Sequence, residues 1–149
     1  MSRGWTLLHE NDCYLCEPFW GMQVAVAHAA AGQTDTALAI LRDLIAMTEQ
    51  SGQRWLDAEL HRVRGELLLR DDPTDVREAE GAFRKALEIA RGQQTKTFEL
   101  RAAIGLAHLS ISSGREASDV LTRALIDLDP AQELPELEQA KKLFRRSYG

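Results

Sequence analysis

The chain has little of what several classes of protein require. Its 149 residues include two cysteines and four prolines, and no uncharged apolar run approaches the roughly 18–20 residues of a membrane-spanning helix. Two cysteines cannot build a disulfide framework. The opening residues also lack the apolar stretch of a signal peptide. We therefore expect a protein of the cytoplasm that has no membrane partner.

Positive charge and catalytic motifs are scarce as well. The 18 Lys and Arg residues are outnumbered by 23 Asp and Glu residues, which gives a net charge of −5. Without a basic face, nucleic acid is not an expected partner. No Gly-x4-Gly-Lys-Ser/Thr phosphate loop occurs, and His28, His61 and His108 have no nucleophile at a hydrogen-bonding helical offset. We expect no enzyme, no cofactor and no metal.

An internal repeat is present. A triplet of apolar residues with spacings of four and three occurs three times: Ala37, Leu41 and Leu44; Ala79, Phe83 and Ala86; Ala117, Leu121 and Ala124. Each triplet marks one side of a helix. Because the leading alanines are 42 and 38 residues apart, each unit has room for two helices and their turns. The repeat therefore predicts helical hairpins.

Turn and capping residues divide the chain into helices. Gly32, Gly52, Gly92 and Gly114 each follow an apolar-periodic stretch, where a left-handed residue would end a helix. Pro18 fits a first helical turn, Asp35 can act as an N-cap, and Asp75 with Glu78 resembles a capping box. These signals predict seven helices and no strand, over residues 18–31, 35–49, 54–70, 76–91, 97–112, 115–127 and 135–146.

The fourth predicted helix carries the family resemblance. Its pattern Ala79-x3-Phe83-x2-Ala86-Leu87, with Gly65 in the preceding helix, is similar to the signature of tetratricopeptide (TPR) repeats. Residues 54–69 and 79–91 resemble the C-terminal repeat region of large bacterial signalling proteins, which join an ATPase to a cyclase or a DNA-binding domain. The resemblance spans about residues 19–144.

The resemblance implies an all-α, TPR-like right-handed superhelix in a single domain. Its parts are a lead-in over 1–17, hairpins over 18–51, 54–91 and 97–128, and a C-terminal helix over 135–147. The concave face of such a stack holds peptides. The chain is thus expected to be a non-catalytic interaction or regulatory scaffold with a protein or peptide partner. A detached regulatory domain of a bacterial signalling ATPase or cyclase is an alternative that the resemblance supports.

The expected concave face defines the candidate binding residues. They are Phe19, Met22, Arg62, Glu66, Arg101, Ile104 and His108. We expect Arg62 and Arg101 to hold a carboxylate of the partner, because a guanidinium pairs with one through two hydrogen bonds. Helical carboxylates such as Glu59, Glu66 and Glu99 are expected on exposed faces in pairs with Arg and Lys.

The N-terminal segment offers two further hypotheses. His9, Cys13 and Cys16 have the spacing of metal ligands, so a small metal-binding protein or enzyme is an alternative function, although a fourth ligand is missing. The competing interpretation is that both cysteines are small apolar residues at the entrance of the first helix. Trp5, Phe19 and Trp20 have little sequence to cover them, which predicts a homodimer contact there.

Overall fold

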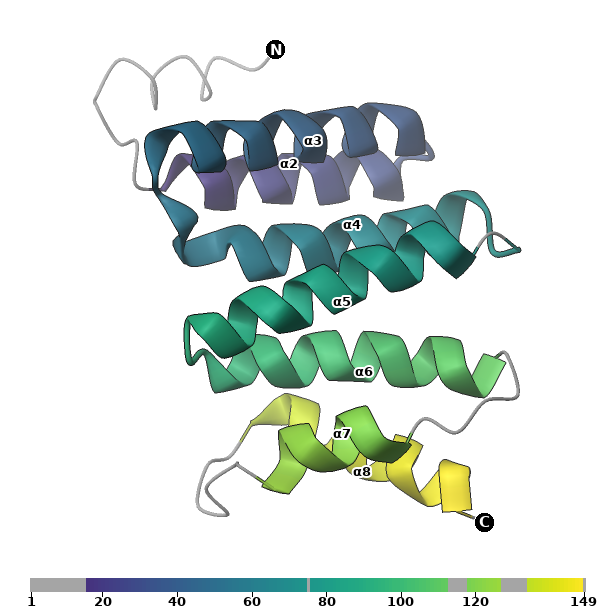
Figure 1. Cartoon of the computed structure of the whole chain (residues 1–149). Coiled ribbons are helices and arrows are strands. Elements are labelled where there is room, and N and C mark those ends of the chain that lie inside the picture. Colours follow the sequence, from purple (N-terminus) through teal and green to yellow (C-terminus); the bar gives the residue numbers. More distant parts are fainter. Residues whose placement is uncertain (1–15, 75, 113–117, 127–133, 149) are drawn as a thin grey trace. The chain divides into compact units, whose positions relative to one another are not determined.

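The structure is a computed structural model that describes residues 16–74, 76–112, 118–126 and 134–148. Within these ranges every regular element is a helix and there is no strand, so the predicted all-α fold is confirmed. None of the helices in these ranges has the length and apolar character that crossing a lipid bilayer requires. The helices are α2 (Glu17–Ala30), α3 (Thr34–Ser51), the 3-10 helix η1 (Arg54–Leu56), α4 (Asp57–Asp71), α5 (Val76–Gly92), α6 (Lys96–Ser112), α7 (Ser118–Ile126) and α8 (Pro135–Tyr148) (Figure 1).

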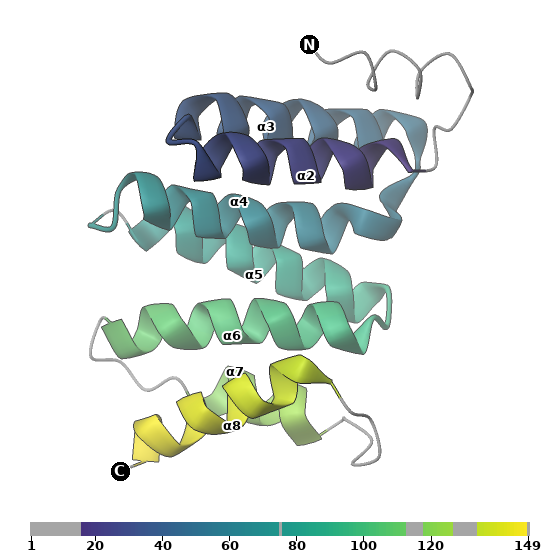
Figure 2. The same ribbon diagram turned by 180° about the vertical axis from the view of Figure 1, so that it is seen from behind.

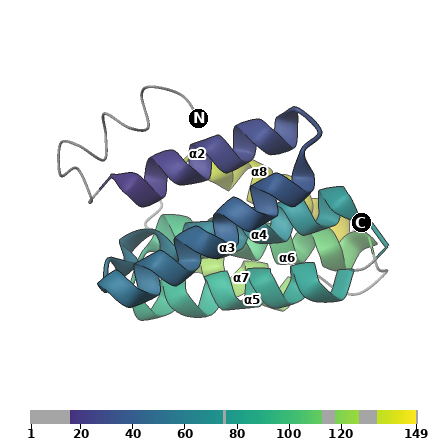
Figure 3. The same ribbon diagram turned by 90° about the horizontal axis from the view of Figure 1, so that it is seen from above.

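The chain divides into two compact units, one ending at Leu56 and the other beginning at Asp57. The first unit contains α2 and α3, which a tight turn joins into a hairpin (Figure 3). Gly32 and Gly52 follow the two helices with φ angles of 80° and 74°, as predicted for left-handed helix ends. A Cβ atom on Gly21 would lie 2.7 Å from Cδ2 of Leu44, so the two helices approach closely at this point.

The helix starts in the first unit confirm one prediction and correct another. Pro18 lies in the first turn of α2, as expected. Helix α3 begins at Thr34, one residue earlier than predicted, and its N-cap is Gln33, whose side chain makes no capping hydrogen bond. The predicted cap at Asp35 is therefore wrong. Asp35 instead lies in the first turn, where its negative charge is favoured by the helix dipole.

The second unit is built around α6. Helices α4 and α5 form a hairpin, α6 packs against both of them, and α7 and α8 pack against α6 (Figures 1 and 2). Phe83 of α5 is 1% exposed and lies among the three packed helices. A Cβ atom on Gly65 of α4 would be 3.0 Å from its ring, and one on Gly105 of α6 would be 2.5 Å from it. The two glycines therefore make the space that the ring occupies.

The turn between α5 and α6 departs from the sequence prediction. Gly92 is the last residue of α5 and is not left-handed; the residue with a positive φ, of 57°, is Gln94. The turn closes two residues later than predicted, where the Thr95 amide donates to the Ala90 carbonyl at 3.0 Å. Gly114 and Asp75 lie outside the described residues. The superhelix of three hairpins stays a prediction.

Candidate functional site

Two arginines from different helices meet at one buried carboxylate. Glu59, near the start of α4, accepts hydrogen bonds from Arg62 Nε and Nη2 at 2.9 and 3.0 Å. Arg101 of α6 donates to the same carboxylate through Nη1 at 3.0 Å. The Glu59 side chain is only 6% exposed. A buried carboxylate is stable when cations and hydrogen bonds compensate it, and here both guanidiniums do so.

The remaining carboxylates of this network come from α8 and α4. Glu136 of α8 accepts a hydrogen bond from Arg101 Nε at 2.7 Å, and Glu66 accepts one from Arg62 Nη1. Burial alone would raise the pKa of the Glu136 carboxyl. Its own backbone N–H, together with the hydrogen bond and charge of Arg101, outweighs burial and holds that pKa below the ordinary value. Glu136 is therefore ionised near neutral pH.

The same contacts raise the pKa of Arg101. Burial disfavours its charged form, but the hydrogen bond to Glu136 and the charges of Glu59 and Glu136 outweigh burial and raise the pKa of Arg101. The Arg101 guanidinium thus remains charged at any pH at which the protein is folded.

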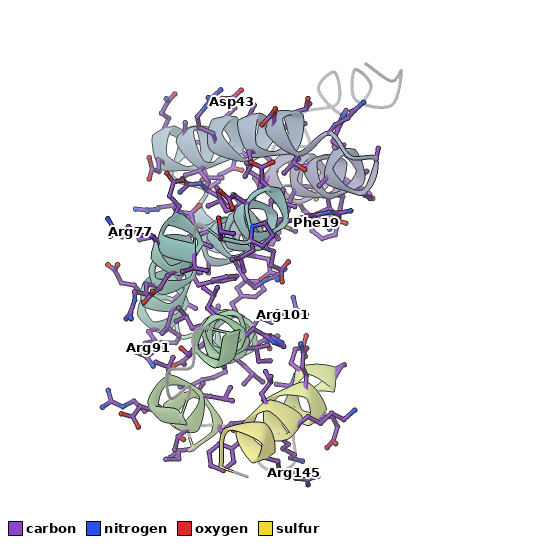
Figure 4. All side chains as sticks on the ribbon, turned by 90° about the vertical axis from the view of Figure 1, so that its right-hand side faces the viewer. Phe19, Asp43, Arg77, Arg91, Arg101 and Arg145 are labelled. Carbon is purple, nitrogen blue, oxygen red and sulfur yellow. The ribbon has the colours of Figure 1, made fainter. Side chains whose placement is uncertain are left out.

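These side chains surround a hollow of about 310 Å³ on the α8 side of α6. Figure 4 shows Arg101 projecting from α6 toward that side, whereas Arg91, at the end of α5, lies on the opposite side. Apolar groups from α4, α5 and α6 form part of its wall, and charged or polar groups form the rest. The lining residues are Arg62, Glu66, Leu69, Phe83, Arg101, Ile104, Gly105, His108, Glu136 and Gln139.

A second hollow continues from the first. It measures about 410 Å³, shares His108 and Gln139 with its neighbour, and adds Lys142, Leu143 and Arg145 of α8. The Gln139 amide nitrogen lies 3.3 Å from Nε2 of His108, so these two side chains meet at the boundary. Together the two hollows follow α6 and α8.

The structure brings five of the seven candidate residues together. Arg62, Glu66, Arg101, Ile104 and His108 all line the first hollow. The other two candidates lie on α2 in the other unit, where Phe19 is 38% exposed and Met22 is 5% exposed. Met22 is therefore covered and presents almost no surface to a partner. The carboxylates that Arg62 and Arg101 hold in the structure belong to this chain.

Two carboxylates expected on exposed faces are buried. Glu59 and Glu99 are each 4% exposed, which corrects the prediction for both. Glu99 accepts hydrogen bonds from Arg91 Nε at 2.8 Å and from Lys96 Nζ at 3.2 Å. The physical reason is the same at both sites, because two cations compensate each buried charge. Glu66 is 54% exposed, as expected for a helix surface.

Sequence reasoning missed the contribution of α8. Neither Glu136 nor Gln139 is among the predicted binding residues, yet both line the hollow. The Arg101–Glu136 pair joins residues 35 positions apart, and helical spacing holds no signal for such a contact. Pro135 indicates where α8 begins, but it does not indicate which neighbour the first turn contacts.

The metal hypothesis involves residues that are largely outside the described ranges. His9 and Cys13 lie there, and so does Trp5 of the predicted dimer contact. Cys16 is half-buried at the N-cap of α2. Among the residues that the structure describes, no group of three or more His, Cys, Asp or Glu is arranged to hold a metal ion.

Comparison with known proteins yields no match to a family model, to a curated protein or to a solved structure.

Proposed function

We propose that this chain is a non-catalytic protein-interaction module of the cytoplasm with TPR-like repeats. In this proposal, a segment of a partner protein binds in the hollow between α4, α6 and α8. The observation that carries the proposal is the combination of an apolar wall, including Leu69 and Ile104, with charged side chains that are already fixed by hydrogen bonds. Groups that are ordered before binding lose little conformational entropy when a partner arrives.

The chemistry of the hollow favours binding over catalysis. A general acid needs a raised pKa so that it holds its proton near neutral pH. The pKa of Glu136 is lowered instead, and the carboxylates of Glu59 and Glu66 are bonded to Arg62. These groups are suited to holding a charged side chain in place.

Site-specific cross-linking tests this proposal. A photoreactive benzoylphenylalanine replaces His108 at the edge of the hollow, and in a control it replaces Arg84, an exposed residue of α5 outside it. We expect mass spectrometry to identify one segment of one cellular protein attached at position 108 and absent at position 84. The same adducts at both positions would contradict the proposal.

We also propose that α2 forms a homodimer contact. Phe19, Trp20, Val24 and Val26 are between 38% and 47% exposed and share one half of the helix, while Met22 and Ala25 are buried on the other half. The rings of Phe19 and Trp20 meet edge to face with centroids 5.5 Å apart. Exposed apolar side chains gathered on one half of a helix favour association.

A further inference from the structure

The charges around the hollow do not balance. The network contains three carboxylates, from Glu59, Glu66 and Glu136, and two guanidiniums, from Arg62 and Arg101. One negative charge therefore remains in excess. An occupant with a carboxylate would add a fourth and would have to displace one of the carboxylates already bound.

One carboxylate oxygen of the network has no donor among the described residues, and another carboxylate is exposed. Oε2 of Glu136 is buried and accepts no hydrogen bond from the described residues. Glu66 is bonded to Arg62 through Oε1. Because the Glu66 side chain is 54% exposed, an incoming group can reach it. The excess charge is thus accessible at the α4 end of the hollow.

The apolar wall fits the rest of such a group. Leu69, which is half-buried, lines the hollow beside Glu66 and Glu136, together with Phe83 and Ile104, which are 1% and 6% exposed. Lysine and arginine have aliphatic stems that lie on apolar surface while the charged head stays with polar partners. From this combination we infer that the occupant inserts a lysine or arginine side chain, with its stem on Leu69 and its head bonded to Glu66. This inference rests on the proposed function.

Two other observations agree with a basic occupant. The net charge of the whole chain is −5, which attracts a cationic segment at long range. The adjoining hollow carries two cationic side chains, those of Lys142 and Arg145. These two cations repel a basic side chain, so its favoured place is the α4 end, and the binding register of the segment is thereby fixed.

The low pKa of Glu136 supports the same assignment. The Glu136 side chain is only 15% exposed, and burial favours a neutral carboxyl, yet this group stays ionised. Its negative charge therefore acts on an occupant throughout the neutral pH range. A charge-assisted hydrogen bond to Glu66, reinforced by the nearby charge of Glu136, changes affinity by about tenfold.

Selection from a library of random peptides tests the inference. The full chain is immobilised, bound peptides are sequenced, and their contact site is mapped from the backbone amide resonances of Gly105 and His108. We expect the selected peptides to share one lysine or arginine position. Replacing that residue with norleucine, which keeps the stem and removes the charge, should weaken binding about tenfold.

Matched variants locate the interaction. Glu66→Gln, which can still accept from Arg62, should weaken binding of the lysine peptide about tenfold and leave the norleucine peptide unaffected. Glu88→Gln makes the same charge change on an exposed face of α5 and should leave both affinities unchanged. Folding of each variant is verified by circular dichroism and by its amide spectrum.

The remaining outcomes separate the two proposals. Peptides that shift Gly105 and His108 but are enriched in Asp or Glu, or are insensitive to norleucine, would overturn the inference and leave the proposed function standing. Peptides that shift only residues outside the hollow, or a selection that yields no binder, would overturn both.

Discussion

Arg101 of α6 holds Glu136 of α8, with Nε and Nη2 both 2.7 Å from the same carboxylate oxygen, Oε1. This pair fastens the last helix to the middle of its unit. It also places a carboxylate of α8 where the sequence suggested that a partner's carboxylate would bind. The Arg101 side chain is 37% exposed and the Glu136 side chain is 15% exposed, so the carboxylate is the better shielded from water of the two groups.

The pair predicts acid sensitivity. The pKa of Glu136 is lower in the folded chain than its ordinary value, so its stabilisation is present above the ordinary carboxyl pKa and is lost as pH falls through the lowered one. We expect wild type to be more stable than Glu136→Gln near neutral pH and the difference to vanish in strong acid. Urea denaturation at several pH values measures it. A difference that does not change with pH would contradict this account.

The packing of Phe83 predicts opposite effects at two glycines of the second unit. Gly105→Ala places a Cβ atom 2.5 Å from the Phe83 ring, and we expect a loss of about 1–3 kcal/mol in unfolding free energy. Gly81 lies in the interior of α5, and a Cβ atom added there would meet no atom within 4 Å, so Gly81→Ala should gain about 0.5–1 kcal/mol. Denaturant titration compares the two. Equal effects would show that the ring does not limit the space.

The left-handed turn residue predicts a stabilising substitution. Gln94 has a φ of 57°, a conformation that costs a residue with a Cβ roughly 1–2 kcal/mol relative to glycine. Gln94→Gly should therefore raise the unfolding free energy by about 1 kcal/mol, in spite of the greater flexibility of the unfolded chain. Gly52→Ala, at a φ of 74°, should lower it by a similar amount. Thermal and urea denaturation measure both changes.

The exposed half of α2 predicts a change in oligomeric state. We expect wild type to sediment as a dimer at micromolar concentration, and Trp20→Ser combined with Val24→Ser to sediment as a monomer. Ile126→Ser is the matched control, because Ile126 is 73% exposed on α7 and belongs to the other unit. Loss of the dimer in the control as well would remove α2 as the contact.

Sequence patterns predicted the helices because they depend on neighbours along the chain. Ala79, Phe83 and Ala86 repeat at helical spacing, and all three are buried on one side of α5. Turn details were predicted less well, since Gly92 is the last residue of α5 and Gln94, in the connection that follows, adopts the left-handed conformation. The all-α architecture could thus be predicted, but the geometry of this turn could not.

The site is formed by contacts between helices, and the spacing of residues along the sequence does not predict such contacts. Glu59 and Arg62 are three residues apart, and so are Lys85 and Glu88, yet the first pair is largely buried and the second is exposed. What separates them is Arg101, which reaches Glu59 from 42 positions away. The sequence therefore predicted that Arg62 and Arg101 hold carboxylates. Which carboxylates they hold is determined by the packing of α4, α6 and α8.

Glu59 is bonded to both Arg62 and Arg101, and its burial determines how strongly ionic strength affects these two contacts. Salt screens interactions between exposed charges much more than those between buried ones. The carboxylate that joins Arg62 to Arg101 is 6% exposed, so added salt weakens this contact between α4 and α6 less than it weakens an exposed pair such as Lys85 and Glu88. If a partner segment binds in the hollow as proposed, a weakening of its binding by salt reports mainly on the exposed charges of the segment and of Glu66.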